Sequence, residues 1–140
     1  MKKTISILGS TGSIGLSTLK IIDKNKKIFT VNLLSANKNV KKASKQIKKY
    51  KPNYFVISNK DAYKKLKIKF KNNKTKIINN FNNINSKKKI DITISAIPGI
   101  IGLEPTILMI KLSRKLLIAN KESVICGWKL IKSSALKYRT

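Results

Sequence analysis

The sequence of 140 residues contains no histidine, one cysteine and only five acidic residues. Without histidine the chain lacks the side chain that most often acts as a general base, and most zinc chemistry is excluded. The single cysteine, Cys126, excludes an internal disulfide and suits a reducing cytosol, so we expect a cytoplasmic protein. The acids are Asp23, Asp61, Asp91, Glu104 and Glu122. No two of them are spaced to hold Mg²⁺ or Mn²⁺, so the sequence predicts no metal site within this chain.

Long apolar runs are also missing. No stretch approaches the roughly 20 residues that a membrane span requires, so we expect no membrane association. Only two lysines separate Met1 from the first predicted strand, and we expect no signal peptide. A hydrophobic content of 41% is typical of a globular chain. Length and composition together predict one domain, or a piece of a larger protein, with its own core.

Arginine and aromatic residues are scarce in an otherwise very basic chain. The formal net charge of +27 suggests a nucleic-acid partner. However, Arg114 and Arg139 are the only arginines among the 32 basic residues, and the abundance of lysine, asparagine and isoleucine is the pattern that A/T-rich codons produce. The lysines are spread along the chain without a basic stripe carrying aromatic residues that could stack on bases. We therefore expect non-specific polyanion binding at low salt and no specific nucleic-acid partner.

The most informative stretch is the glycine-rich segment at residues 4–15, Thr-Ile-Ser-Ile-Leu-Gly-Ser-Thr-Gly-Ser-Ile-Gly. It predicts a short buried strand, a G-x-x-G-x-x-G turn and a helix that begins near Ser13. Gly9 would allow a sharp turn, Gly12 a close approach of the backbone to phosphates, and Gly15 close packing of the helix on the sheet. The free N–H groups at the helix start would face the anion. A plain tight turn before a helix is the alternative interpretation.

The rest of the chain alternates between strand and helix patterns. Further strands are predicted at residues 29–35, 54–57, 76–78, 90–95 and 116–119, and further helices at 40–49, 61–70, 105–112 and 124–136. This alternation predicts an α/β fold: a Rossmann-like, doubly wound, mostly parallel sheet with helices on both faces, forming one domain over residues 1–140. Ligands bind beyond the carboxyl ends of such strands. The loops at 9–15, 36–39 and 120–123 should therefore share one rim.

The second strand indicates which dinucleotide the fold would bind. An NAD site uses an acidic residue about 20 positions beyond the glycines to hold the ribose 2′-hydroxyl. This chain has no acid between Asp23 and Asp61, and Asn37, Lys38 and Asn39 follow the second strand instead. A lysine with amide neighbours suits the 2′-phosphate of NADP(H). Because lysine is so frequent here, a solvated turn lysine is the alternative, and the missing acid is the stronger argument for NADPH.

Three separated motifs resemble one family. They are Gly-Ser-Thr-Gly-Ser-Ile-Gly at 9–15, Ser-Ala-Ile-Pro-Gly-Ile-Ile-Gly-Leu-Glu-Pro-Thr at 95–106, and Leu-Ile-Ala-Asn-Lys-Glu-Ser-Val-Ile-Cys-Gly at 117–127. Their order and intervals resemble the amino-terminal, NADPH-binding Rossmann domain of the 1-deoxy-D-xylulose 5-phosphate reductoisomerases. That resemblance implies a metal-dependent rearrangement of 1-deoxyxylulose 5-phosphate, followed by reduction with NADPH to 2-C-methylerythritol 4-phosphate in isoprenoid synthesis.

The same resemblance assigns site residues by motif. The residues implied at the cofactor phosphates are Thr11, Gly12, Ser13 and Ile14, and those at the 2′-phosphate end are Asn37, Lys38 and Asn39. Asn120 and Glu122 would hold the cofactor, and Lys121 would face the sugar phosphate substrate as a point charge. The family usually has glycine where this chain has Asn37, and asparagine tolerates a positive φ better than most residues. No catalytic residue is implied within this chain.

The resemblance also implies further domains. In the family an acidic Asp-Ser-Glu segment binds the divalent metal, Mg²⁺ or Mn²⁺, soon after the last helix, and a C-terminal helical domain follows. The sequence ends at Thr140 before such a segment. We therefore expect an inactive fragment of an enzyme that is a homodimer at full length.

Two other interpretations stay open. One is a degenerate stand-alone NADP-binding module. The other is a semialdehyde-dehydrogenase-like NADP reductase, which would use a cysteine nucleophile. Because no histidine can activate Cys126 and an apolar run precedes it, we expect this cysteine to be packed in the core.

Overall fold

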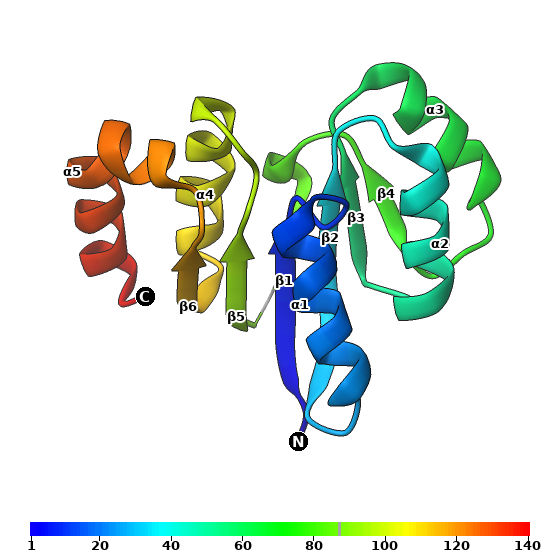
Figure 1. The fold of residues 1–140 in the computed structure, drawn as a ribbon, viewed down its shortest axis with the longest axis horizontal. Helices are drawn as coiled ribbons and strands as arrows, with labels where there is room; N and C mark the ends of the chain where they lie inside the picture. Colours follow the sequence, from blue (N-terminus) through cyan, green and yellow to red (C-terminus); the bar gives the residue numbers. More distant parts are fainter. Residues whose placement is uncertain (87) are drawn as a thin grey trace.

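The structure, a computed structural model, describes residues 1–86 and 88–140. Within these residues one sheet contains six strands in the order β4-β3-β2-β1-β5-β6. Every neighbouring pair is parallel, so the arrows in Figure 1 point the same way. The strands are β1 (Lys3–Leu8), β2 (Phe29–Ala36), β3 (Tyr54–Ile57), β4 (Lys76–Ile78), β5 (Ile90–Ser95) and β6 (Ser113–Ile118). This arrangement confirms the predicted parallel α/β sheet.

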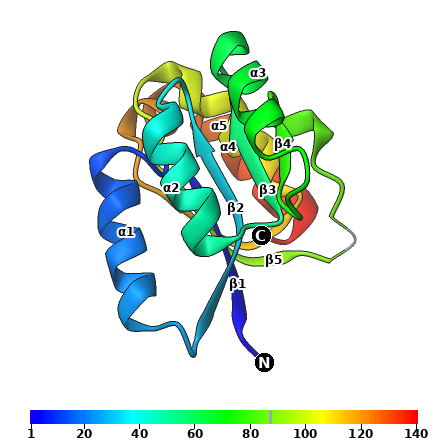
Figure 2. The ribbon, with the colours of Figure 1, turned by 90° about the vertical axis from the view of Figure 1, so that its right-hand side faces the viewer.

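Helices cover both faces of the sheet. They are α1 (Ser13–Lys24), α2 (Val40–Tyr50), α3 (Lys60–Lys69), α4 (Leu103–Ile110) and α5 (Lys121–Tyr138), with 3₁₀ turns at Phe81–Asn83 and Ile100–Gly102. Figure 2 shows α1 and α2 side by side on one face. The turn at Phe81–Asn83 and α4 pack on the opposite face, and α5 packs against α4.

The side chains along each strand contribute alternately to two cores, because successive side chains point to opposite faces of a sheet. Ile7 of β1 and Phe55 of β3 pack under α1, α2 and α3, whereas Leu8 and Val56 pack beneath α4 with Met109. Both faces are therefore buried, which explains why these strands are almost entirely apolar.

The chain reverses direction across the sheet between β1 and β5. Strands β2, β3 and β4 follow one another on one side of β1. The chain then crosses back, so that β5 pairs with the other side of β1. In open α/β sheets such a reversal opens a crevice at the carboxyl ends of the two strands. The loops that follow β1 and β5 meet at this point.

The structure corrects several details near the carboxyl terminus. β6 begins at Ser113 rather than residue 116, because the exposed side chains of Arg114 and Lys115 are tolerated on an edge strand. Residues 121–123 are not a separate turn but the first turn of α5, which Asn120 caps. Cys126 is exposed, not packed, because the buried residues of α5 are Ser123, Gly127 and Ile131 on a different side of the helix.

Candidate functional site at the carboxyl edge of the sheet

Two adjoining cavities lie at the carboxyl ends of the strands. The first has a volume of about 420 Å³ and lies between the loops after β1, β2 and β5. The second, of about 310 Å³, lies between the first turns of α1 and α5. Both cavities are lined by Gly12, Ala96, Ile97 and Pro98. They therefore form one continuous rim across the switch point.

The glycine-rich loop turns sharply off β1 as predicted. Gly9 has a φ of +82°, and a Cβ there would lie 2.7 Å from the Ala96 carbonyl oxygen. Gly15 lets α1 begin close against the loop, because a Cβ there would overlap the Gly9 carbonyl and lie 2.6 Å from the Cα of Ser10. The close packing at Gly15 is thus with the loop rather than with a strand. Both glycines are required by the fold itself.

Gly12 is different, because the fold does not require it. Its backbone is extended, with a φ of −80° and a ψ of 175°, which any residue can adopt. A Cβ there would meet only the Gly9 carbonyl oxygen, at 3.4 Å, which is ordinary contact. Gly12 nevertheless lines both cavities, where a side chain would fill space. The missing Cβ fits a bound group that approaches the backbone, such as a pyrophosphate.

The electrostatics of the second cavity also favour an anion. Gly12 is the N-cap of α1, and no side chain of the described residues caps this helix. The N–H groups of the first turn and the positive end of the helix dipole are therefore available to a ligand. Ser13 and Ile14 of α1 and Lys121 of α5 line the cavity, so the amino ends of two helices meet there.

The turn after β2 brings the three predicted polar residues to the same rim. Asn37 lines the first cavity, and its carbonyl accepts a hydrogen bond from the Asn59 N–H. Asn39 caps α2 by accepting from the Lys42 N–H at 2.9 Å. Lys38 lies between them with an exposed side chain. This lysine is thus free to reach an anion bound beyond the end of β2.

Asn120 ties the loop after β5 to the start of α5. Its Nδ2 donates to the carbonyls of Ile97 at 2.6 Å and Gly99 at 2.8 Å, and its Oδ1 accepts from the Ser123 N–H. The residue is only 3% exposed. The side-chain amide therefore holds the wall of the second cavity together, while Lys121 and Glu122 beside it line the opening.

The structure gathers most of the predicted site residues and adds others. Thr11, Gly12 and Asn37 line the first cavity; Gly12, Ser13, Ile14, Asn120, Lys121 and Glu122 line the second. Lys38 and Asn39 line neither cavity but stand at the rim beside Asn37. The loop after β5, with Ala96, Ile97 and Pro98, was missed as a lining element. The switch-point rule applied to the strand at 90–95 could have found it.

Groups with shifted pKa values lie outside these cavities. Lys49 donates a hydrogen bond to Asp23 and holds the pKa of that carboxyl below its usual value. The Thr4 backbone N–H, together with the Thr4 hydroxyl, lowers the pKa of Asp91 in the same direction. Both carboxylates tie neighbouring elements together, so we interpret them as structural groups.

Neither metal ligands nor membrane-spanning helices were found in the part of the chain that the structure describes. No group of three or more His, Cys, Asp or Glu side chains in residues 1–86 and 88–140 could hold a metal ion. None of the helices described is both long and apolar enough to cross a membrane. The groups that the rim presents are backbone N–H groups and the side chains of Lys38 and Lys121, which suit an anionic ligand.

A parallel doubly wound sheet with a glycine-rich loop at its switch point places the chain in the class of Rossmann-type nucleotide-binding domains. Within that class, residues 5–127 match the family model of 1-deoxy-D-xylulose 5-phosphate reductoisomerase, and the chain belongs to this family. A relative with this name from Pelagibacter ubique (strain HTCC1062) is 44% identical over 142 residues, covering 99% of this chain and 37% of the relative. One from Buchnera aphidicola subsp. Schizaphis graminum (strain Sg) is 40% identical, covering 89% of this chain and 33% of the relative.

Solved structures of the family have the same fold. The reductoisomerase from Zymomonas mobilis in complex with NADPH matches with a TM-score of 0.88 and 29% identity, over 100% of this chain and 38% of that one. A reductoisomerase in complex with NADPH, fosmidomycin and magnesium matches with a TM-score of 0.87 and 31% identity, over 97% of this chain and 34% of that one. The chain thus spans little more than a third of the length of these relatives.

Proposed function

We propose that this chain is the NADPH-binding domain of a 1-deoxy-D-xylulose 5-phosphate reductoisomerase. The observation that carries the proposal is Gly12, a glycine that the fold does not need, placed where two cavities meet at the amino end of α1. The membership of the family and the NADPH in the Zymomonas mobilis relative support the identity of the ligand. The cavities leave room for a ligand that extends from β2 to α5.

The loop from Thr11 to Ile14 binds the pyrophosphate in this proposal. The N–H groups of Ser13 and Ile14 lie in the first turn of α1, where the helix dipole favours negative charge, whereas the Gly12 N–H donates to the Gly9 carbonyl. Because Gly12 carries no side chain, phosphate oxygens can approach the backbone directly. The alternative interpretation, a tight turn without a ligand, does not explain why a glycine stands at a position with an extended backbone and with open space for a side chain.

The turn at residues 37–39 distinguishes NADPH from NADH. Lys38 supplies a charge to the 2′-phosphate, and the amides of Asn37 and Asn39 flank it. An acidic residue at this position would repel the phosphate, and none lies between Asp23 and Asp61. NADPH when bound supplies a hydride, and the role of this turn is to select and anchor the dinucleotide that carries it.

The start of α5 faces the reacting end of the cofactor. Asn120 holds the loop after β5 in place, and Glu122 lies half-buried at the cavity wall. Lys121 is exposed at the opening of the second cavity, where its ammonium is available to the phosphate of a sugar phosphate substrate. The domain thereby orients the cofactor and contacts one end of the substrate.

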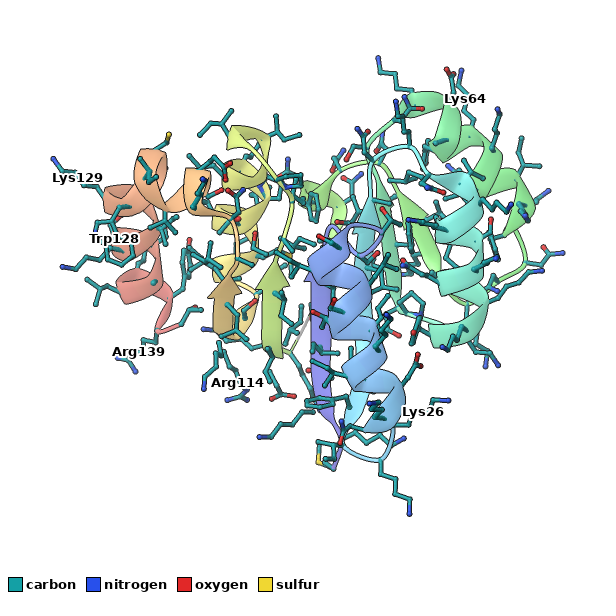
Figure 3. All side chains as sticks on the ribbon, in the orientation of Figure 1. Lys26, Lys64, Arg114, Trp128, Lys129 and Arg139 are labelled. Carbon is teal, nitrogen blue, oxygen red and sulfur yellow. The ribbon has the colours of Figure 1, made fainter. Side chains whose placement is uncertain are left out.

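The activity of the whole protein extends beyond this domain. We propose that the remaining two thirds of the length seen in the relatives supply the metal ligands and the groups for the rearrangement to 2-C-methylerythritol 4-phosphate. The assembly is then a cytoplasmic homodimer with no specific nucleic-acid partner. The exposed basic side chains of Lys26, Lys64 and Lys129 project from separate parts of the molecule (Figure 3), which supports dispersed charge rather than a binding stripe.

A fluorescence titration with NADPH and, in parallel, NADH tests the proposal. We expect saturable NADPH binding and much weaker NADH binding by the purified chain. Binding of neither dinucleotide contradicts the assignment of the rim. Equal binding of both retains the glycine-rich loop as the pyrophosphate site but contradicts the role of Lys38.

A further inference from the structure

A buried polar network lies beneath the glycine-rich loop, with Ser35 at the wall of the first cavity and its other members outside both cavities. Its members are Ser10, Ser35 and Gln46, which are 0%, 2% and 6% exposed, respectively. Gln46 belongs to α2 and Ser35 belongs to β2. On α2, Gln46 lies next to Ile47 and about one turn after Ala43, and both of these residues belong to the apolar core on this face of the sheet. Polar groups buried in such surroundings are costly unless they are hydrogen-bonded. The contacts of the network therefore indicate what it holds.

Gln46 makes a two-point contact with Ser10. Its Nε2 donates to the Ser10 carbonyl at 2.9 Å, and the Ser10 hydroxyl donates to its Oε1 at 2.6 Å. From β2, the Ser35 hydroxyl accepts from the Gly9 N–H at 2.9 Å, and the Ser35 carbonyl accepts from the Ser10 N–H at 2.8 Å. The two residues that follow β1 are thus fixed by side chains from β2 and α2.

The same side of α2 reaches the loop a second time. Lys42 lies one turn before Gln46, so the two side chains project along one face of the helix. The Lys42 Nζ donates to the Thr11 carbonyl at 3.4 Å. At its amino end, α2 is capped by Asn39, the last residue of the turn that carries Lys38. One helix is therefore attached to both predicted phosphate sites.

We propose that Gln46 is a positioning residue of the cofactor site, an inference that rests on the proposed binding of NADPH. Gln46 lines neither cavity, yet it sets the position of Ser10, and so of the N–H groups from Thr11 to Ile14, relative to α2. The pyrophosphate site and the 2′-phosphate site then keep a fixed spacing, because a single rigid helix connects them. Binding depends on that spacing, because the pyrophosphate and the 2′-phosphate of one dinucleotide must occupy both sites at the same time.

Replacing Gln46 by methionine tests this role, because methionine has a similar volume and makes neither hydrogen bond. We expect Gln46→Met to bind NADPH about tenfold more weakly, the effect of one to two lost hydrogen bonds. In ³¹P NMR of the bound cofactor, the pyrophosphate resonances should move while the 2′-phosphate resonance stays near its position in the unsubstituted chain. A purely structural role would lower the melting temperature without moving the pyrophosphate resonances.

Ser44→Ala is the matched control, because Ser44 is buried on the same helix and its hydroxyl has no hydrogen-bond partner among the described residues. It should bind NADPH like the unsubstituted chain. Should Gln46→Met fail to fold, Ser10→Ala keeps the bond to the Ser10 carbonyl and should give a smaller loss of affinity with the same ³¹P signature. Unchanged affinity and unchanged pyrophosphate resonances in the folded variant overturn the inference alone. An unsubstituted chain that binds no NADPH overturns the proposed function and this inference with it.

Discussion

The two ends of the sheet carry cavities of similar size but different construction. At the amino end, a pocket of about 430 Å³ is lined mainly by amides and lysines, among them Asn32, Asn53, Lys74 and Lys76. At the carboxyl end, the first cavity of about 420 Å³ is lined by backbone, small residues and apolar side chains. A count of positive charges would select the amino end. Several structural differences favour the carboxyl end.

Helices distinguish the two ends. At the carboxyl end α1 and α5 begin, so free N–H groups and positive dipole ends face the rim. At the amino end α2 and α3 finish before β3 and β4 begin, which presents the dipole end that repels anions. The buried Asn32 Nδ2 there finds no partner among the described residues, whereas Ser10 beneath the glycine-rich loop is fully hydrogen-bonded. We therefore infer the binding site from the fixed backbone at the carboxyl end and not from a high density of lysine.

The largest effect should come from filling the space at Gly12. Gly12→Ala should lower NADPH affinity about 100-fold, because a methyl group there would push the phosphates away from the backbone N–H groups and weaken about two charge-assisted hydrogen bonds. Its melting temperature should change little, since a Cβ there meets only ordinary contact. Gly15→Ala is the contrasting variant, and it should lose stability because its Cβ would overlap the loop backbone. Fluorescence titration and thermal unfolding measure both; a Gly12→Ala chain with undiminished affinity would contradict the account.

Lys38→Met should have the next largest effect. Loss of a charge-assisted hydrogen bond to the 2′-phosphate should weaken NADPH binding about tenfold and leave NADH binding unchanged. Parallel titrations with the two dinucleotides measure this difference. If both affinities fall equally, Lys38 contributes general positive charge rather than selectivity.

The amino end should show its importance in stability instead. Asp91 accepts hydrogen bonds from the Thr4 N–H and hydroxyl at 2.8 and 2.9 Å, and Asp91→Asn should cost about 1 kcal/mol of unfolding free energy at neutral pH. Because the folded-state pKa of Asp91 is lowered, its contribution is complete above the usual value of 3.8 and is lost as the pH falls through the folded pKa. The folded-state pKa of Asp23 is also lowered, so the contribution of Asp23 to stability depends on pH in the same direction.

Urea unfolding of both proteins at about pH 7 and about pH 3 checks this expectation. The difference in stability between the unsubstituted chain and Asp91→Asn should shrink in acid, and their NADPH affinities at neutral pH should agree. A difference that grows in acid would mean that the carboxylate is not the stabilising form.

The smallest effect on the cofactor should come from the lysines of the amino-end pocket. A double variant, Lys74→Met with Lys76→Met, should bind NADPH within about twofold of the unsubstituted chain, because exposed charges this far from the rim are screened by salt. Its non-specific binding to a polyanion at low salt should weaken. A large loss of NADPH affinity would mean that the cofactor binds at the amino end of the sheet, which would contradict the proposed site.

The sequence predicted the fold well because its signals are local. Short apolar runs ended by turn residues identified five of the six strands closely, including the three-residue strand at Lys76–Ile78. The glycine-rich loop was predicted from spacing, and the φ of Gly9 confirms the sharp turn. β6 was misjudged at its start because Arg114 and Lys115 lie on an edge, where burial no longer requires apolar residues.

The site was predicted less completely because its scaffolding is not local. Gln46 meets Ser10 across 36 positions of sequence, and Asn120 meets Ile97 across 23. Neither pairing has a periodicity or spacing that one sequence displays. Cys126 was misassigned for a related reason: an apolar run predicts burial, but which side of α5 is buried depends on where α4 lies.

Amide chemical-shift mapping with NADPH can locate the cofactor on the molecule, because it compares both ends of the sheet in one experiment. Addition of NADPH to the ¹⁵N-labelled chain should perturb the amides of residues 9–15, 37–39, 96, 97, 99 and 121–122. The amides of residues 53–54 and 74–76 at the amino end should stay unchanged. Perturbations centred on the amino-end pocket, or no perturbations at saturating NADPH, would contradict the assignment of the cofactor site to the carboxyl edge.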